Sequence, residues 1–171
     1  MTEADPETRL LDAQHDAHHE SLRLWLRLLT CTLTIERGIR SCLRERFAMT
    51  LPRFDLMAQL ERNPHGLKMG ELSRRLMVTS GNVTGLTDQL VDEGMVERVA
   101  IPADRRAFLV RLTAKGKAAF DAMAAEHESW VVAMFSGLSG SERERLHALL
   151  GRLKTTIPPA GDTHAKRKVR A

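Results

Sequence analysis

The feature of this sequence that most restricts its fold is a change of periodicity at Gly94. Before Gly94, apolar residues recur at steps of three and four residues, as they do on one face of a helix. After Gly94, two short segments at 95–99 and 107–112 are rich in β-branched and aliphatic residues, as strands are. A turn is predicted at 101–106. Two helices, 68–76 and about 81–93, are predicted immediately before the change, joined by a short connection at 78–81.

The order of these segments predicts a winged helix-turn-helix: helix, short helix, turn, helix, hairpin. Residues 10–47 contain no proline, and they form either one long helix or two helices broken near residue 20 or 38. Further helices are predicted at 54–62, from Thr113 to about residue 136, and at 139–157. The fold class is therefore mainly α, with a small two- or three-stranded β-wing and a helical dimerisation region.

Composition places the chain among soluble globular proteins. It has 171 residues, of which 43% are hydrophobic, so a core is available. There is no apolar run near the roughly 20 residues of a membrane span, and the start of the chain does not resemble a signal peptide. Only two cysteines are present, as is typical of a reducing compartment. We therefore expect a cytoplasmic protein.

The charge is distributed unevenly along a chain whose formal net charge is +4. Residues 62–117 carry ten Lys/Arg against six Asp/Glu, whereas residues 1–20 are acidic. A basic central segment permits a nucleic-acid partner without proving one.

The helix at 81–93 has the composition of a DNA-reading helix. Val83, Leu86 and Leu90 fall on the side expected to face the core, and the remaining side chains are small and polar. Side chains of this kind donate to and accept from base edges and phosphates, and glycine permits a close backbone approach. The predicted DNA-binding residues, including two basic residues of the preceding helix and three of the hairpin, are Arg74, Arg75, Ser80, Gly81, Asn82, Thr84, Thr87, Gln89, Asp104, Arg105 and Arg106.

At the predicted hairpin tip, Arg105 or Arg106 is expected to enter the minor groove, where the negative potential favours a guanidinium. Asp104 would pair with one of them. Each feature has an ordinary alternative, since a polar helix start is often a cap and a charged turn is often only solvated. The order of the features together favours DNA binding.

Five stretches carry a resemblance to a known family: 51–60, 72–76, 81–87, 90–97 and, most specifically, 102–116. They resemble MarR-family transcriptional regulators, most closely the branch that regulates aromatic-acid catabolism. The resemblance implies a homodimer formed by the first and last two helices, a palindromic operator on double-stranded DNA, and a small-molecule or oxidant signal that relieves repression. It also implies an aromatic acid or its CoA thioester as the effector.

The C-terminal helices independently predict a dimer. Residues 130–135 are apolar nearly all round, and residues 139–157 carry a leucine stripe. This is more apolar surface than a small winged domain covers. Packing against the first helix of the same chain is the alternative. We expect a dimerisation segment at 1–47, a DNA-binding domain at 48–116, dimerisation helices at 117–158, and a disordered basic tail at 159–171.

An effector site is predicted from basic residues spaced along the first long helix, accompanied by apolar residues. A salt-bridged face with Glu36 and Glu45 is an equally good interpretation. No other cofactor is expected. The candidate effector-binding residues are Trp25, Leu29, Arg37, Arg40, Arg44, Phe47, Arg53, Phe54 and Met57.

Other functions are less well supported. Cys31 and Cys42 lie about 16 Å apart on one helix face, and buried structural cysteines are favoured over an oxidant sensor. A solvated face is favoured over a metal site for His15, His18 and His19, so no metal is expected. No nucleophile elbow, P-loop or dinucleotide fingerprint points to an enzyme. A helical adaptor that binds only protein would not need the Arg105–Arg106 pair.

Overall fold

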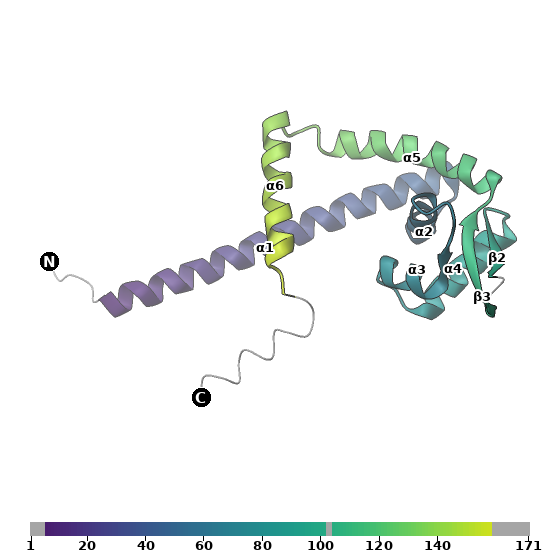
Figure 1. The fold of residues 1–171 in the computed structure, drawn as a ribbon. Helices are drawn as coiled ribbons and strands as arrows, with labels where there is room; N and C mark the ends of the chain where they lie inside the picture. The colour runs from purple at the N-terminus through teal and green to yellow at the C-terminus, as the bar shows by residue number, and fades with distance from the viewer. Residues whose placement is uncertain (1–5, 102–103, 159–171) are drawn as a thin grey trace. The chain divides into compact units, whose positions relative to one another are not determined.

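The computed structural model describes residues 6–101 and 104–158, and within these the side chains of 19–101 and 108–158. The chain divides into two compact units, residues 1–128 and 129–171. Figure 1 shows the elements in chain order: α1 (Pro6–Phe47), α2 (Leu51–Glu61), β1 (Leu67–Lys68), α3 (Met69–Leu76), α4 (Ser80–Asp92), β2 (Val96–Ile101), β3 (Asp104–Leu112), α5 (Ala114–Met134) and α6 (Gly140–Thr156). The predicted fold class is confirmed.

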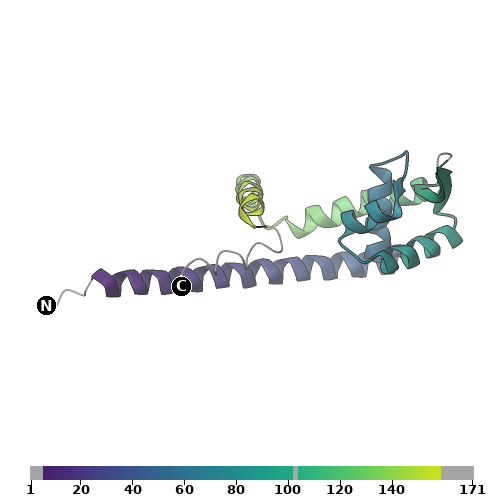
Figure 2. The same ribbon diagram turned by 60° about the horizontal axis from the view of Figure 1, so that its bottom comes forward.

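Helix α1 is a single uninterrupted helix of 42 residues, as Figure 2 shows. At 1.5 Å per residue it is about 63 Å long. Gly38 does not break it, because an isolated glycine costs a helix only about 1 kcal/mol relative to alanine. Burial begins towards its C-terminal end, where Ile39 and Leu43 enter the core of the first unit.

Helices α2, α3 and α4 form the predicted helix-turn-helix. Pro52 lies in the first turn of α2, where its missing N–H costs nothing. The side chain of Thr79 caps α4 by accepting from the backbone N–H of Asn82. Leucine and valine side chains from the three helices fill the core between them: Leu56, Leu60, Leu72, Val83 and Leu90 are all at most 1% exposed.

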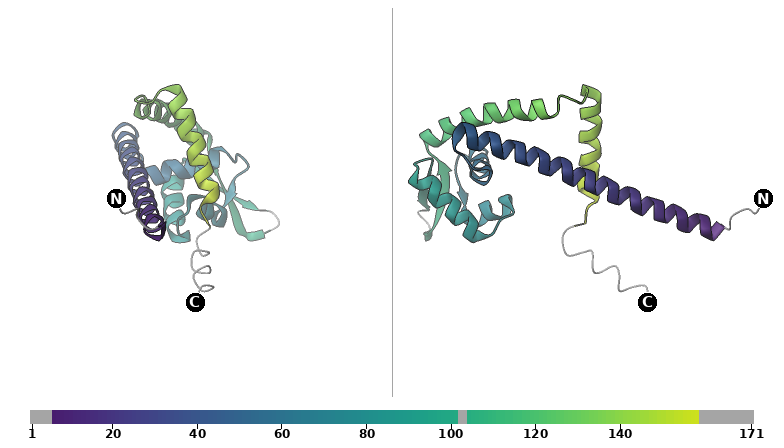
Figure 3. Two further views of the ribbon diagram at one scale, coloured as in Figure 1. Left: turned by 90° about the vertical axis from the view of Figure 1, so that its left-hand side faces the viewer. Right: turned by 180° about the vertical axis from the view of Figure 1, so that it is seen from behind.

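The sheet has the strand order β1-β3-β2, and both strand pairs are antiparallel. The sequence predicts two or three strands and does not locate the third, β1, because two residues are too few to produce a periodic signal. The hairpin is longer than predicted and its turn shorter, since Ile101 is already paired with Asp104. We call the β2–β3 hairpin the wing; it projects to one side of the neighbouring teal helices (Figure 3).

Helix α4, the wing and α5 meet at one tight joint. The Thr113 hydroxyl donates to the carbonyl of Gly94 (2.7 Å) and accepts from the N–H of Gly116 (2.9 Å). The N–H of Thr113 donates to the carbonyl of Met95 (3.1 Å). A Cβ at Gly116 would lie 1.8 Å from that carbonyl oxygen. Only glycine fits where α5 passes over the start of β2.

A buried charge joins α2 to the end of α4. Arg53 is only 8% exposed, and its guanidinium donates to the carboxylate of Glu93, whose own side chain is 45% exposed. The Nε of Arg53 has no hydrogen-bond partner among the described residues. The pair therefore has one desolvated member and one hydrated member.

In the second unit, α6 begins with a reciprocal cap between Ser139 and Glu142. The hydrogen bonds from Ser139 lower the pKa of Glu142. No residue of α6 is buried, and Leu149, Leu150, Leu153 and Ile157 are exposed. Across the residues that the structure describes, no helix is both long enough and apolar enough to cross a membrane.

We expect Gly116→Ala to destabilise the protein, because its methyl group would overlap the Met95 carbonyl. The free energy of unfolding should fall by about 3 kcal/mol, and Tm by roughly 10 °C. Thermal unfolding followed by circular dichroism measures this. Gly70→Ala is the matched control, since its Cβ meets nothing within 4 Å. Equal melting temperatures for the two variants would contradict the close approach.

We expect the two halves of the Arg53–Glu93 pair to respond unequally to substitution. Glu93→Ala leaves a buried cation without its counter-ion and should cost about 2 kcal/mol. Arg53→Met removes the buried charge, leaves only a hydrated carboxylate, and should cost under about 1 kcal/mol. Urea denaturation of both variants measures the difference. A larger loss in Arg53→Met than in Glu93→Ala would disprove the desolvation argument.

Candidate functional site

Helix α4 presents an exposed polar surface. Ser80, Asn82, Thr84 and Gln89 are all exposed, while Val83 and Leu90 point into the core. The Thr84 hydroxyl donates to the carbonyl of Ser80 (2.9 Å), which leaves its acceptor lone pairs available. The structure therefore places four of the predicted DNA-binding side chains on the outside of one helix.

Two glycines lie at the centre of this surface. A Cβ at Gly81 or Gly85 would meet nothing within 4 Å. Both glycines line an open groove of about 370 Å³, together with Asn82 and Gln89 of α4 and Pro52 of α2. The fold itself therefore does not require glycine at these positions.

Thr87 corrects one prediction. Its side chain is 0% exposed, and its hydroxyl donates to the carbonyl of Val83 (2.8 Å) and lies 3.8 Å from the sulfur of Met69. Thr87 follows Val83 by one helical turn and so faces the core with it. Its polarity suggested the outer face, but a threonine hydroxyl is easily satisfied by the preceding turn of its own helix.

Of the remaining predicted DNA-binding residues, the structure describes the side chains of two and not those of the other three. Arg74 and Arg75 are exposed in the last turn of α3, and Arg75 donates to Glu71 of the same helix (2.7 Å). Asp104, Arg105 and Arg106 begin β3, and their side chains lie outside the described part of the structure.

A contact between α4 and the wing was not predicted from the sequence. Arg98 of β2 donates to the carboxylate of Asp88 on α4, and its guanidinium lies 5.1 Å from the ring centroid of Phe108 on β3. Asp88 and Arg98 are ten residues apart on different elements. Single-residue patterns carry no signal for such a contact.

The predicted effector residues do not form one site. Phe54 and Met57 are core residues, and Arg53 pairs with Glu93. Trp25 is 56% exposed on α1, and it lies 22 residues, or about 33 Å, from Phe47 along the same helix. These assignments are wrong for a pocket within one subunit, because a helix separates distant residues along its axis. Arg37 and Arg44 are exposed, and Leu29 is half-buried.

Arg40 lines a cavity. The cavity has a volume of about 190 Å³ and is walled by Arg40, Pro52, Asp55, Leu76, Val78 and Leu86. Desolvation raises the pKa of Asp55, although its side chain remains in contact with water and the positive charges of His127 and Arg40 oppose the shift. Arg40 donates to Glu36 at 2.9 and 2.5 Å, which confirms the Glu36 part of the predicted salt-bridged face, whereas the Glu45 carboxylate accepts from the Ser41 hydroxyl (2.7 Å). Leu86 belongs to α4, so this cavity touches the helix with the polar surface.

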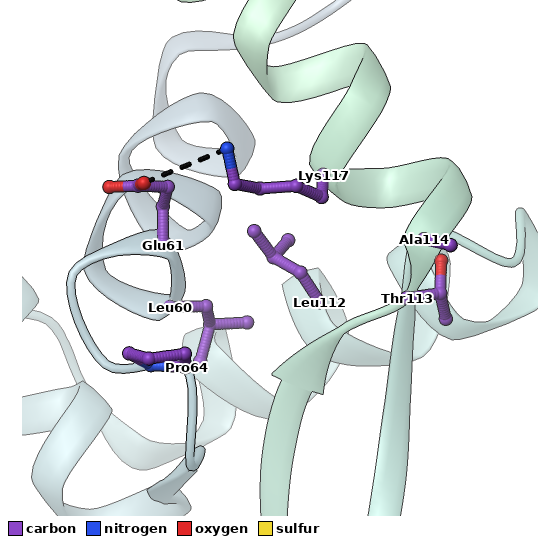
Figure 4. Close-up of a pocket in the computed structure, with 7 residues that line it drawn as sticks. All are labelled: Leu60, Glu61, Pro64, Leu112, Thr113, Ala114 and Lys117. Carbon is purple, nitrogen blue, oxygen red and sulfur yellow. Dashed lines mark ion pairs between the residues drawn. The ribbon is translucent and has the colours of Figure 1, made fainter.

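A second cavity, of about 280 Å³, lies at the joint between α2 and α5 (Figure 4). Leu60, Pro64 and Leu112 form its apolar wall, and Lys117 lies 3.8 Å from Glu61. A hydrogen bond to Asp121 raises the pKa of Lys117. No residue of α4 lines this cavity, so it is less suited than the Arg40 cavity to act on that helix.

The cysteine and histidine predictions have different outcomes. Cys42 is half-buried, but Cys31 is exposed, contrary to the expected burial, because the buried part of α1 begins further along the helix. The side chains of His15 and His18 lie outside the described residues. Among the described side chains, no group of three histidine, cysteine or carboxylate residues is placed to bind a metal.

The comparisons with known proteins agree on one family. The sequence model of the MarR family matches residues 49–107. A MarR-family transcriptional regulator from Silicibacter pomeroyi is 34% identical; the match covers 83% of this chain and 99% of that one, with a TM-score of 0.68. The transcriptional regulator PecS from Dickeya dadantii is 28% identical over 72% of this chain and 75% of its own length.

A MarR variant from E. coli complexed with operator DNA has a TM-score of 0.69 at 24% identity, over 78% of this chain and 95% of that one. At that identity it shows the fold alone. Against the other leading curated relatives, the chain spans only 54% to 59% of their length.

The relatives are transcriptional regulators, so the prediction of a regulator rather than an enzyme is confirmed. The chain belongs to the MarR family of winged helix-turn-helix transcriptional regulators.

Proposed function

We propose that this protein is a homodimeric repressor that binds a palindromic operator on double-stranded DNA and is released by a small aromatic acid. Helix α4 is the major-groove element. Ser80, Asn82, Thr84 and Gln89 are its contact residues, since their side chains are exposed and match the donors and acceptors of base edges.

The observation that carries this proposal is the open surface at Gly81 and Gly85. Glycine in a helix costs about 1 kcal/mol relative to alanine, and neither position is constrained by the chain itself. The two glycines therefore leave room for another molecule, whose backbone approaches α4 closely. DNA phosphates at a helix N-terminus are such a partner.

Basic residues around α4 supply the second part of the proposal. Arg74 of α3 is exposed, which supports a role in holding phosphates. Arg105 or Arg106 of the wing enters the adjacent minor groove, as the sequence predicts. Asp104 fixes one of the two.

The dimer is supported by α6. Its exposed Leu149, Leu150 and Leu153 lie along one stripe, and the exposed Ile157 follows directly after the helix. Burying this stripe against a second copy would remove apolar surface from water, at about 25 cal/mol per Å². A two-fold dimer also pairs naturally with a palindromic site.

The effector site is the cavity beside Arg40. Its volume of about 190 Å³ is below the roughly 300–1,000 Å³ of pockets for drug-sized ligands, which favours a one-ring acid over a whole CoA thioester. The guanidinium of Arg40 would bind the carboxylate in competition with Glu36. A ring against Leu86 would displace α4 and so weaken DNA binding.

We expect Gly85→Ala to weaken operator binding without lowering stability. The methyl group would occupy the surface that DNA approaches, so affinity should fall about tenfold, or roughly 1.4 kcal/mol, while Tm stays equal or rises. The probe is a duplex that the wild-type protein selects from a random pool, and affinity is measured by fluorescence anisotropy.

Gly151→Ala is the matched control for Gly85→Ala, because its Cβ is equally open but lies on α6. It should leave the affinity unchanged. Wild-type affinity in Gly85→Ala would contradict the assignment of this face. Failure of the wild-type protein to select any duplex at low salt would contradict the proposed function as a whole.

We expect benzoate or 4-hydroxycinnamate to release the wild-type protein from the selected duplex. Arg40→Ala should raise the ligand concentration needed by about tenfold, since it removes a charge-assisted hydrogen bond. Arg44→Ala is the control, because Arg44 is exposed on the same helix and does not line the cavity. Titration calorimetry measures binding directly. No heat and no release with either acid would reject the effector assignment.

A further inference from the structure

Three side chains connect α4 to the wing. The guanidinium of Arg98 on β2 donates to Asp88 on α4 and lies over the ring of Phe108 on β3, 5.1 Å from its centroid. Arg98 of β2 thus connects its own strand to α4 and to β3. We call this set the Arg98 bridge.

The Arg98 bridge lies at the edge of the apolar core. Residues 96, 98 and 100 of β2 lie on one face of the sheet, since side chains alternate along a strand. Val96 is 2% exposed, whereas Arg98 and Ala100 are exposed. Beyond Val96, β2 adds no buried side chain to this face, and among the described side chains the last fully buried residue on it is Val110 of β3, directly opposite Arg98. Near the end of the ladder the register also shifts, between Ala100 and Ile101.

The opposite face of the wing has a different kind of ion pair. Glu97 and Arg111 are directly opposed across β2 and β3, and the Nε of Arg111 lies 2.7 Å from the carboxylate. This pair joins strand to strand, whereas the Arg98 bridge joins strand to helix. The two pairs have similar exposure, with side chains between 35% and 49% exposed.

We propose that Arg98 is a positioning residue for DNA recognition, which sets the direction of the wing relative to α4 through Asp88 and Phe108. This inference rests on the proposed function, because direction matters only if both elements engage one duplex. Grooves of B-DNA have a fixed separation, so a helix in the major groove and an arginine in the minor groove must be held in matching positions.

Energetics support positioning over stabilisation. An exposed ion pair contributes little to folding, and an exposed cation–π contact adds only a modest amount. Removing the bridge should therefore leave the protein folded and change only the freedom of the wing.

The alternative is that Arg98 binds a phosphate directly. Its guanidinium is already engaged by Asp88 and Phe108, which argues against this. The two roles predict opposite signs for Asp88→Asn. If Arg98 binds phosphate, losing the Asp88 carboxylate frees the guanidinium, removes a negative charge from the DNA-facing surface, and tightens binding to every duplex.

The test compares Asp88→Asn with the wild-type full chain on two duplexes: one selected from a random pool by the wild-type protein, and one scrambled duplex of equal length and composition. We expect affinity for the selected duplex to fall about tenfold, with affinity for the scrambled duplex unchanged or slightly higher. Equal tightening on both duplexes would overturn the proposal.

Charge-conserving variants separate geometry from charge. Arg98→Lys keeps the charge but loses the planar fork and the stacking on Phe108. It should therefore lose the preference for the selected duplex over the scrambled duplex, as Asp88→Asn does. Arg111→Lys is the matched control on the opposite face of the wing and should keep the wild-type preference for the selected duplex. Equal selectivity in the two variants would also overturn the proposal.

Hydrogen exchange of the DNA-free protein provides a measurement that does not depend on the proposed function. Backbone amides of 96–101 and 108–112 should exchange faster in Asp88→Asn than in Glu97→Gln, because only the first change detaches the wing from α4. Equal exchange would refute the bridge even if duplex binding behaved as expected. If the wild-type protein selects no duplex, the proposed function fails, and hydrogen exchange alone then decides whether the bridge exists.

Discussion

The winged domain depends on one close approach of two backbones, where α5 passes over the carbonyl of Met95 at Gly116. The Thr113 hydroxyl completes this joint by bonding to both Gly94 and Gly116. Because the end of α4, the start of β2 and the end of β3 all meet there, the joint fixes the origin of the wing and the end of α4 together. A side chain at Gly116 would move every one of them.

Cationic groups reinforce the same end of α4. Lys115 donates to the carbonyl of Glu93 (2.7 Å), Arg53 pairs with the Glu93 carboxylate, and Arg98 pairs with Asp88. Positive charge near a helix C-terminus is favourable, because the backbone dipoles place partial negative charge there. The helix is thus held at its C-terminal end, while its N-terminal half, with the exposed Ser80, Asn82 and Thr84, is left accessible.

Most of the fold could be predicted from the sequence, because helix periodicity and the glycine at position 94 are local signals. The exposure of Ser80, Asn82, Thr84 and Gln89 was predicted from their polarity and spacing. The burial of Thr87 was not predicted, since a hydroxyl that donates to its own helix cannot be distinguished in sequence from one that faces water. Arg53 and Arg98 were also not predictable, because their partners lie 40 and ten residues away. Effector residues spread along α1 were grouped wrongly, because spacing on one helix shows a shared face but not a shared pocket.

The lack of buried side chains in α6 has a consequence for the lifetime of the chain. A helix without core contacts opens at little free-energy cost, far below that of unfolding the domain. Proteolytic turnover of a solitary subunit would therefore start in the C-terminal unit, and the steady-state level of the protein would depend on whatever shields that helix.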